Sequence, residues 1–338
     1  MMLELRRLAD SEFQSWDQTV ARFADGTVFH TYDWMVTIER LFGIEKLLLG
    51  VFRDGQMVGV FPAFRARKGI LRVLASPLGG WATYYGGPLV DISLQNTVLT
   101  AFDVLLRRER IDYTEIRYPH LSAVQALGKQ GYHVEEKQTY VLALDRPIDQ
   151  LWEGLKSTCR RAVRKAQRSG VEVIEPDRKD FLEDYYELAK DTYRKSNRLP
   201  PLSAQQLGIV WDTLKDKDRM KVLLARHAGR TIAGAIFLLF EDKAYYWDGA
   251  AYRAGLSMRP NNLIHWTLIE WAASHDYRTY DMLGANMPSI ARFKETFGCQ
   301  LRPFCYAYKS LSWRATLGRA MYRRVMPSLR AWQYRFLG

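Results

Sequence analysis

Apolar residues along this chain gather in short runs separated by turn dipeptides, and one arrangement of such runs occurs twice. Residues 47–64 (LLLGVFRDGQMVGVFPAF) form two apolar runs around Asp54-Gly55, and residues 222–240 (VLLARHAGRTIAGAIFLLF) form two more around an Ala-Gly pair. A turn dipeptide that ends in Gly between apolar runs is a strong signal for a β-hairpin. The pattern therefore predicts two related hairpins, one in each half of the chain.

Each predicted hairpin is followed by the same succession of a strand, a helix and a further short strand. We expect the helices over 95–107 and 262–274, and the short strands over 113–118 and 279–283. The two copies are roughly 175 residues apart, far more than the repeat of about 20–50 residues in a solenoid. The sequence therefore predicts a duplicated α/β (α+β) domain, in which a mixed, mostly antiparallel sheet is flanked by helices.

The domain boundary is predicted near Pro147, because a strand-like run (YVLALD) ends just before it and helical spacing begins just after it. The expected domains are 1–147 and 148–310, followed by a helical tail at 311–338. The tail residues 312–338 contain six Arg and no acidic residue, interleaved with aromatic residues. This composition suits a helix that packs back onto the first domain, or a segment that binds an anionic membrane or RNA.

Charge and cysteine content narrow the classes of function. A net charge of +12 favours anionic partners such as nucleic acid, phosphorylated metabolites or a membrane surface. The three Cys form no CxxC pair and the six His no HExxH motif, so we expect no disulfide framework, metal site or cofactor. The longest apolar run, 232–240, is too short to span a bilayer, and no signal peptide is evident. A cytoplasmic protein, or one peripheral to the inner membrane surface, is expected.

A strongly basic helix is predicted over 151–168. Arg160, Arg164 and Arg168 recur every four residues and so share one face. Like charges at this spacing repel one another, and an anion such as phosphate would offset the repulsion. Arg160 and Arg164 are therefore candidates for substrate binding, the alternative being a solvated helix face.

The helix expected from residue 262 onward carries a second set of candidates. Asn262 can cap this helix, and His265 and Trp266 fall in its first turn. Free backbone N–H groups and the positive end of the helix dipole make that turn suitable for an anion. For His265, a buried structural histidine is the alternative.

The segment ARFKETFG, residues 291–298, carries a third candidate. Phe293 and Phe297 lie one helical turn apart, with Lys294 between them. A lysine in partly apolar surroundings can stabilise negative charge that develops on a carbonyl or phosphate oxygen. The alternative is an ordinary surface lysine.

These segments resemble the Fem family of aminoacyltransferases and the broader Fem-like GNAT proteins. The shared pattern is PNNLIHWTLIEWA, then YRTYDMLG, then FKETFG, over residues 260–298. The basic helix, LKSTCRRAVRKAQRSGVEV, and the segments FHTYDWM and YYGGP of the first half also resemble the family, so the resemblance spans most of the chain. It implies two tandem GNAT-like domains, the second of which carries the transfer site.

The resemblance also implies an activity. Fem enzymes transfer an amino acid from aminoacyl-tRNA to an amine of a peptidoglycan precursor, which is an anionic acceptor. By resemblance, Lys294 stabilises charge during transfer, Phe293 shapes the site, and Arg198 is a candidate for holding the precursor's diphosphate. Tyr85 of YYGGP and Tyr246 of the strand AYYWDGAA are further candidates for substrate binding.

The attacking amine must lose a proton, and Asp281 at the end of the last repeated strand is a candidate base or orienting group. Two other functions stay open. One is an acyl-CoA-dependent N-acyltransferase of cell-envelope or exopolysaccharide biosynthesis, although Pro260 lacks an N–H and no glycine flanks it for close approach to a pyrophosphate. The other is a non-catalytic protein that binds RNA or a membrane surface.

Overall fold

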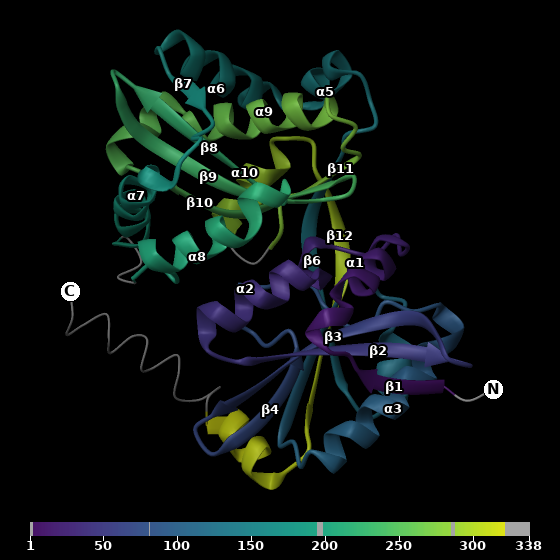
Figure 1. Cartoon of the computed structure of the whole chain (residues 1–338). Coiled ribbons are helices and arrows are strands. Elements are labelled where there is room, and N and C mark those ends of the chain that lie inside the picture. The colour runs from purple at the N-terminus through teal and green to yellow at the C-terminus, as the bar shows by residue number, and fades with distance from the viewer. Residues whose placement is uncertain (1–2, 81, 195–198, 285–287, 322–338) are drawn as a thin grey trace. The chain divides into compact units, whose positions relative to one another are not determined.

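The computed structural model describes residues 3–80, 82–194, 199–284 and 288–321 (Figure 1). The chain forms two compact units, one of Met1–Lys137 with Pro303–Gly338 and the other of Gln138–Arg302. The sequence patterns placed the divisions at 147 and 310 instead. Strands β6 (His133–Ala143) and β12 (Gln300–Ser310) each continue from one unit into the other. Each division falls within a strand and not in a turn or linker, so the turn signals that indicate a domain boundary do not occur there.

The first unit is built on a sheet in the order β1-β2-β3-β4-β5-β12. Its neighbouring strands are antiparallel except for β4 and β5, which are parallel. Helices α1 and α2 lie on one face of these strands and α3 on the other (Figure 1). The elements are β1 (Leu3–Arg7), α1 (Phe13–Ala21), α2 (Tyr32–Phe42), β2 (Glu45–Arg53), β3 (Gln56–Lys68), β4 (Leu71–Ser76), α3 (Gln95–Arg108), β5 (Tyr113–Tyr118) and α4 (Val124–Lys129).

The second unit has a sheet of the same kind, in the order β6-β11-β10-β9-β8-β7, with β10 and β11 parallel and the other pairs antiparallel. Helix α9 lies on one face with α6 beside it, and α7 and α8 lie on the other (Figure 1). The elements are α5 (Ile148–Gly154), α6 (Ser157–Arg168), β7 (Glu172–Ile174), α7 (Leu182–Arg194), α8 (Ala204–Leu214), β8 (Met220–His227), β9 (Arg230–Phe240), β10 (Lys243–Ala251), α9 (Pro260–Ala273), β11 (Thr279–Asp281) and α10 (Pro288–Glu295).

The repeated sequence pattern corresponds to a repeated fold. The two predicted hairpins are β2–β3 and β8–β9. Each is followed by a pair of parallel strands joined through a helix, β4–α3–β5 in the first unit and β10–α9–β11 in the second. Parallel strands need such a crossover connection. These observations confirm the predicted α/β (α+β) fold class with mixed, mostly antiparallel sheets flanked by helices.

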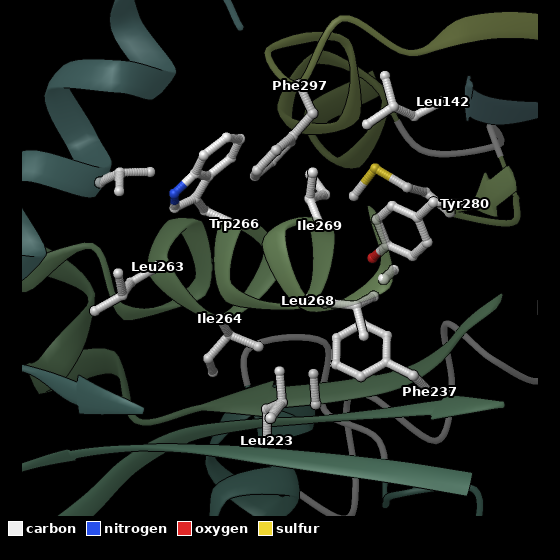
Figure 2. Close-up of a cluster of buried hydrophobic side chains, with 14 of the residues drawn as sticks. Leu142, Leu223, Phe237, Leu263, Ile264, Trp266, Leu268, Ile269, Tyr280 and Phe297 are labelled. Atoms are coloured by element: carbon white, nitrogen blue, oxygen red, sulfur yellow. The ribbon is translucent and has the colours of Figure 1, made fainter. Parts of the chain in front are cut away.

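Helix α9 is the centre of the core in the second unit. Ile264 and Leu268 face Leu223 and Phe237 of the sheet, while Trp266 and Phe297 pack on the far side of the helix (Figure 2). A helix that is apolar on several faces is one that is covered on several sides. This burial fixes the position of α9, and with it the residues of its first two turns. None of the helices in the described ranges combines the length and the hydrophobicity that a bilayer-spanning segment needs.

Candidate functional site

Lys294 on α10 turns its side chain into the second unit and is only 4% exposed. Its ammonium donates to the carbonyl oxygens of Leu283 and Gly284, the second at 2.7 Å, and lies 5.9 Å from the ring centroid of Tyr246. An ammonium has three N–H donors. Within the described residues, the two carbonyls account for two of these donors and fix the position of the ammonium, which leaves one N–H for an oxygen that approaches the site.

The protonation of Lys294 depends on its burial. Removal from water lowers the pKa of Lys294 to about 8, against the opposing attraction of the Asp281 carboxylate. The side chain is therefore cationic at neutral pH and loses its charge as the pH rises through about 8. A cation in such surroundings interacts more strongly with developing negative charge than one in water does.

Asp281 organises the turn that receives Lys294. Its Oδ1 accepts hydrogen bonds from Thr139 Oγ1 at 2.5 Å and from the backbone N–H of Leu283 at 2.8 Å. Leu283 has φ +53°, a left-handed conformation that is costly for a residue with a branched side chain. Asp281 thus holds the backbone so that two carbonyls point at the ammonium, which is the geometry of an orienting group.

His265 lies next to Lys294 in an aromatic environment and is 2% exposed. Its Nδ1 lies 2.6 Å from the hydroxyl of Tyr280, and the ring centroids of Tyr246 and Phe293 are 4.5 and 5.4 Å from its own. Burial, and then the charge of Lys294, lower the pKa of His265 to about 3. The imidazole is therefore neutral at pH 7, so it contributes packing and hydrogen bonding rather than positive charge.

This lowered pKa predicts that His265 makes the protein less stable in acid. Below about pH 6.5 the unfolded chain takes up a proton that the folded imidazole rejects, so folding becomes less favourable as the pH falls. Between about pH 6.5 and 5 the loss attributable to His265 is about 2 kcal/mol. We expect His265→Gln to be less stable than wild type at neutral pH, with the gap narrowing by this amount in acid. Denaturant unfolding of both proteins measures the gap, and parallel pH dependences would contradict the assignment.

The candidates Arg160 and Arg164 lie close to α5. Arg160 donates to the carbonyl oxygens of Glu153 and Leu155, at 2.7 and 2.5 Å. These bonds supply partners for carbonyls at the C-terminal end of α5, which have none within the helix. The guanidinium of Arg164 lies over the ring of Trp152, 5.3 Å from its centroid. Trp152 in turn packs edge-on against Trp266, which is buried in the core (Figure 2).

A neighbouring face of α6 lines a cavity of about 390 Å³. Arg161 and Lys165 from α6 lie at its wall with Arg259, the residue that precedes α9. The remaining lining comes from α6, α9 and the end of α10 and includes no acidic residue; it consists of Thr158, Cys159, Ala162, Asn262, Phe293 and Thr296. Three cations with hydroxyl and amide neighbours suit an anionic group such as a phosphate. Asn262 and Phe293 are thus brought together here, whereas sequence spacing favoured the adjacent arginines of α6.

The glycine that ends FKETFG allows two backbone segments to approach each other closely. Gly298 has φ +77°, and a Cβ there would lie 2.7 Å from the carbonyl oxygen of Gly154. The backbone N–H of Lys156 also donates to Thr296 O at 2.9 Å. Only glycine permits this approach, which holds the end of α10 against the α5–α6 connection.

Asp248 on β10 is a candidate that sequence reasoning missed. It follows a β-bulge between Tyr246 and Asp248, and its carboxylate accepts a 2.7 Å hydrogen bond from the hydroxyl of Tyr185. Burial raises the pKa of Asp248 above its usual value, against that hydrogen bond and one from the Gly249 N–H. The Tyr246 ring, which lies beside the Lys294 ammonium, also lies close to the next residue, Gly249, where a Cβ would be 2.2 Å from the Tyr246 hydroxyl. Bulges re-aim side chains at functional sites and leave no pattern in the sequence.

Of the two remaining candidates, one belongs to the first unit and the other lies outside the described residues. Tyr85 belongs to the first unit, where it is 3% exposed and packs edge-on against Phe29 and Phe304. Arg198 lies outside the described residues. In the portion of the chain that the structure describes, no group of three or more His, Cys, Asp or Glu is placed to hold a metal ion.

Comparison with known proteins shows which proteins the chain is similar to. Residues 154–295 match the family model for an acetyltransferase (GNAT) domain. A curated relative, the lipid II:glycine glycyltransferase of Staphylococcus haemolyticus, is 28% identical over 109 residues, or 32% of this chain. That match spans a quarter (25%) of the relative's length.

Solved structures are similar over nearly the whole chain. FemX superposes with a TM-score of 0.73 at 18% identity, covering 89% of this chain and 96% of FemX. The C-terminal domain (DUF2156) of a putative lysylphosphatidylglycerol synthetase from Agrobacterium fabrum gives 0.60 at 12% identity, covering 93% and 97%. A tandem GNAT protein from the clavulanic acid biosynthesis pathway also gives 0.60 at 12%, covering 92% and 99%. The predicted tandem GNAT-like fold and the resemblance to the Fem family are both confirmed.

Proposed function

We propose, on the premise of this shared fold, that the chain is an acyltransferase that moves an aminoacyl group onto an amine of a cell-wall precursor. The observation that carries the proposal is the buried ammonium of Lys294. This residue lies on α10 in the unit that matches the GNAT model, and two backbone carbonyls hold its ammonium in place. The names of two relatives, FemX and a lipid II:glycine glycyltransferase, support the choice of an aminoacyl group and a peptidoglycan acceptor.

In this reaction the acceptor amine attacks the ester carbonyl of the donor. A C–N bond forms, the C–O bond to the donor's hydroxyl breaks, and the amine proton passes to a base and then to the leaving oxygen. The remaining N–H of Lys294 would stabilise the oxyanion, and Asp281 would keep Lys294 in place. We assign the base to Asp248, whose raised pKa makes it a better proton acceptor than an ordinary carboxylate.

Direct attack by the amine also agrees with the protonation of the cysteine thiols in the second unit. Burial raises the pKa of Cys299 to about 12 and also raises that of Cys159, so neither is a ready thiolate at neutral pH. A covalent acyl-thiol intermediate on either cysteine is therefore not part of the proposal. Transfer would proceed in one step, through the positioning of the two substrates and electrostatic stabilisation.

The cationic cavity is the proposed site for phosphates of the donor. Arg161, Lys165 and Arg259 supply its charge, and Phe293 connects it to the reacting centre because it also packs against His265 beside Lys294. We favour aminoacyl-tRNA over acyl-CoA because α9 begins with Pro260, which has no N–H for a pyrophosphate. The acceptor would be an anionic precursor reached from the cytoplasm or its membrane surface.

Parallel incubations of amine acceptors with charged tRNA and with acyl-CoA test this proposal, with products identified by mass spectrometry. We expect the mass of one aminoacyl residue on the acceptor amine with charged tRNA alone. Transfer only from acyl-CoA would establish the alternative N-acyltransferase. Absence of any product, with RNA or vesicle binding that survives Lys294→Met, would establish a non-catalytic binding protein.

A variant of the cavity tests the donor site within the same assay. The double variant Arg161→Ser/Lys165→Ser removes two cations from the cavity wall. Both side chains are exposed to solvent, so their replacement leaves the buried face of α6 intact. We expect the KM for the donor to rise at least about tenfold, since hydrogen bonds to charged groups contribute about 1.5–3 kcal/mol each. Arg168→Ser, on the same helix but outside the cavity lining, is the matched control.

A further inference from the structure

A short helix near the end of the described chain, residues 313–321, turns apolar side chains towards solvent. Trp313, Leu317 and Met321 recur every four residues and are 71%, 52% and 56% exposed. The opposite face is docked on the first unit, where Ala315 is buried and Arg319 donates to the hydroxyl of Tyr113. A surface helix normally presents its polar face to water, so this stripe is the feature to explain.

The turn between β3 and β4 adds a fourth exposed apolar side chain. Ile70 at this turn is 77% exposed. The helix lies beside the turn, because a Cβ on Gly318 would be 3.6 Å from the Leu71 side chain (Figure 1, yellow helix beneath β4). Both features belong to the first unit. Apolar side chains from two separate elements therefore gather in one region of its surface.

Cationic side chains surround these apolar ones. Arg67, Lys68 and Arg72 flank Ile70 and are exposed, and Arg314 follows Trp313 on the helix. Arg72 and Arg314 both lie near the Asp112 carboxylate, which places the start of the helix next to the start of β4. We name the four apolar residues (Ile70, Trp313, Leu317 and Met321) and these four cations the docking face.

We propose that the docking face binds the surface of an anionic lipid bilayer, with the helix lying in the plane of the interface. Aliphatic and indole side chains would enter the boundary between head groups and acyl chains, and the cations would contact anionic head groups. RNA fits less well, because exposed Leu, Met and Ile side chains offer it neither stacking nor phosphate contacts. A second copy fits less well too, because a twofold interface would bring the same cations together. The proposal does not depend on the transfer reaction.

Binding of the full chain to vesicles tests this proposal. Phosphatidylcholine vesicles with and without phosphatidylglycerol are sedimented with wild type, with Leu317→Ser/Met321→Ser and with Ile92→Ser. Ile92 is an exposed apolar residue (68%) of the same unit that is not part of the docking face. We expect wild type and Ile92→Ser to bind only the anionic vesicles, and the double variant to bind them at least about tenfold more weakly.

A second measurement follows the helix itself. Brominated lipids should quench part of the wild-type tryptophan emission, and that part should be absent in Trp313→Phe. Equal binding by wild type and the double variant would overturn the proposal, as would binding to neutral vesicles of the same strength. A wild-type dimer in the absence of lipid that the double variant abolishes would also overturn it, in favour of a contact between two copies.

Discussion

Replacing Lys294 by methionine should lower the transfer rate at least about 10²-fold while leaving the protein folded. Methionine keeps the apolar stem of the side chain but has no N–H for the oxyanion. The lost bonds to the Leu283 and Gly284 carbonyls destabilise the variant, and removal of a buried charge stabilises it. These effects are of similar size, a few kcal/mol, so we expect little net change in the free energy of unfolding. Steady-state kinetics and thermal unfolding measure the two quantities separately.

A pH profile and a control variant test whether the effect is specific to Lys294. Its lowered pKa predicts that the wild-type rate falls as the pH rises through about 8, where the ammonium loses its proton. Lys221→Met is a matched control, because Lys221 is also a buried lysine of the second unit but pairs with Glu175. This control should lose stability and keep its turnover below its unfolding temperature. Unchanged turnover in Lys294→Met would remove Lys294 from the mechanism.

Asp248→Asn should also abolish most of the transfer activity, by about 10²-fold or more. Asparagine preserves the size of the side chain and can still accept the hydrogen bond from Tyr185, but it cannot take a proton from the amine. Because burial raises the pKa of Asp248, the wild-type rate should fall on the acid side at a higher pH than an ordinary aspartate would give. The pH dependence of kcat/KM for wild type and the variant measures both effects.

Tyr185→Phe distinguishes a base from a structural carboxylate. The Tyr185 hydroxyl stabilises the ionised form of Asp248, so its removal should raise the pKa of Asp248 further. We expect the acid limb of the pH profile to move to higher pH while the maximal rate changes little. A lower maximal rate with an unmoved acid limb would assign Asp248 to the fold instead.

The parts of the fold that the sequence predicts are those with a local physical cause. Apolar runs around Asp54-Gly55 and Ala228-Gly229 predict the β2–β3 and β8–β9 hairpins because the turn and the strands lie side by side in the sequence. The duplication follows from comparing those patterns. Lys294 between Phe293 and Phe297 could likewise be recognised, since all three lie within one short segment.

Features that depend on distant residues could not be predicted in this way. Helical spacing groups Arg160 with Arg164 but cannot show that both contact residues of α5 and its C-terminal end. The cations that line the cavity are instead Arg161 and Lys165. The bulge before Asp248 is a shift in the register between β10 and β9, so the sequence of β10 alone does not reveal it. Strands β6 and β12 continue from one unit into the other, and neither contains a turn at the point of division.

The proposed mechanism requires Lys294 to face the carbonyl of a bound donor. A crystal structure of the chain with a stable amide analogue of the 3′ end of aminoacyl-tRNA shows directly whether it does. We expect the carbonyl oxygen within hydrogen-bond distance of Lys294 Nζ, with phosphate in the cavity of Arg161, Lys165 and Arg259. An analogue bound elsewhere, with its carbonyl remote from the Lys294 ammonium, would contradict the proposed mechanism.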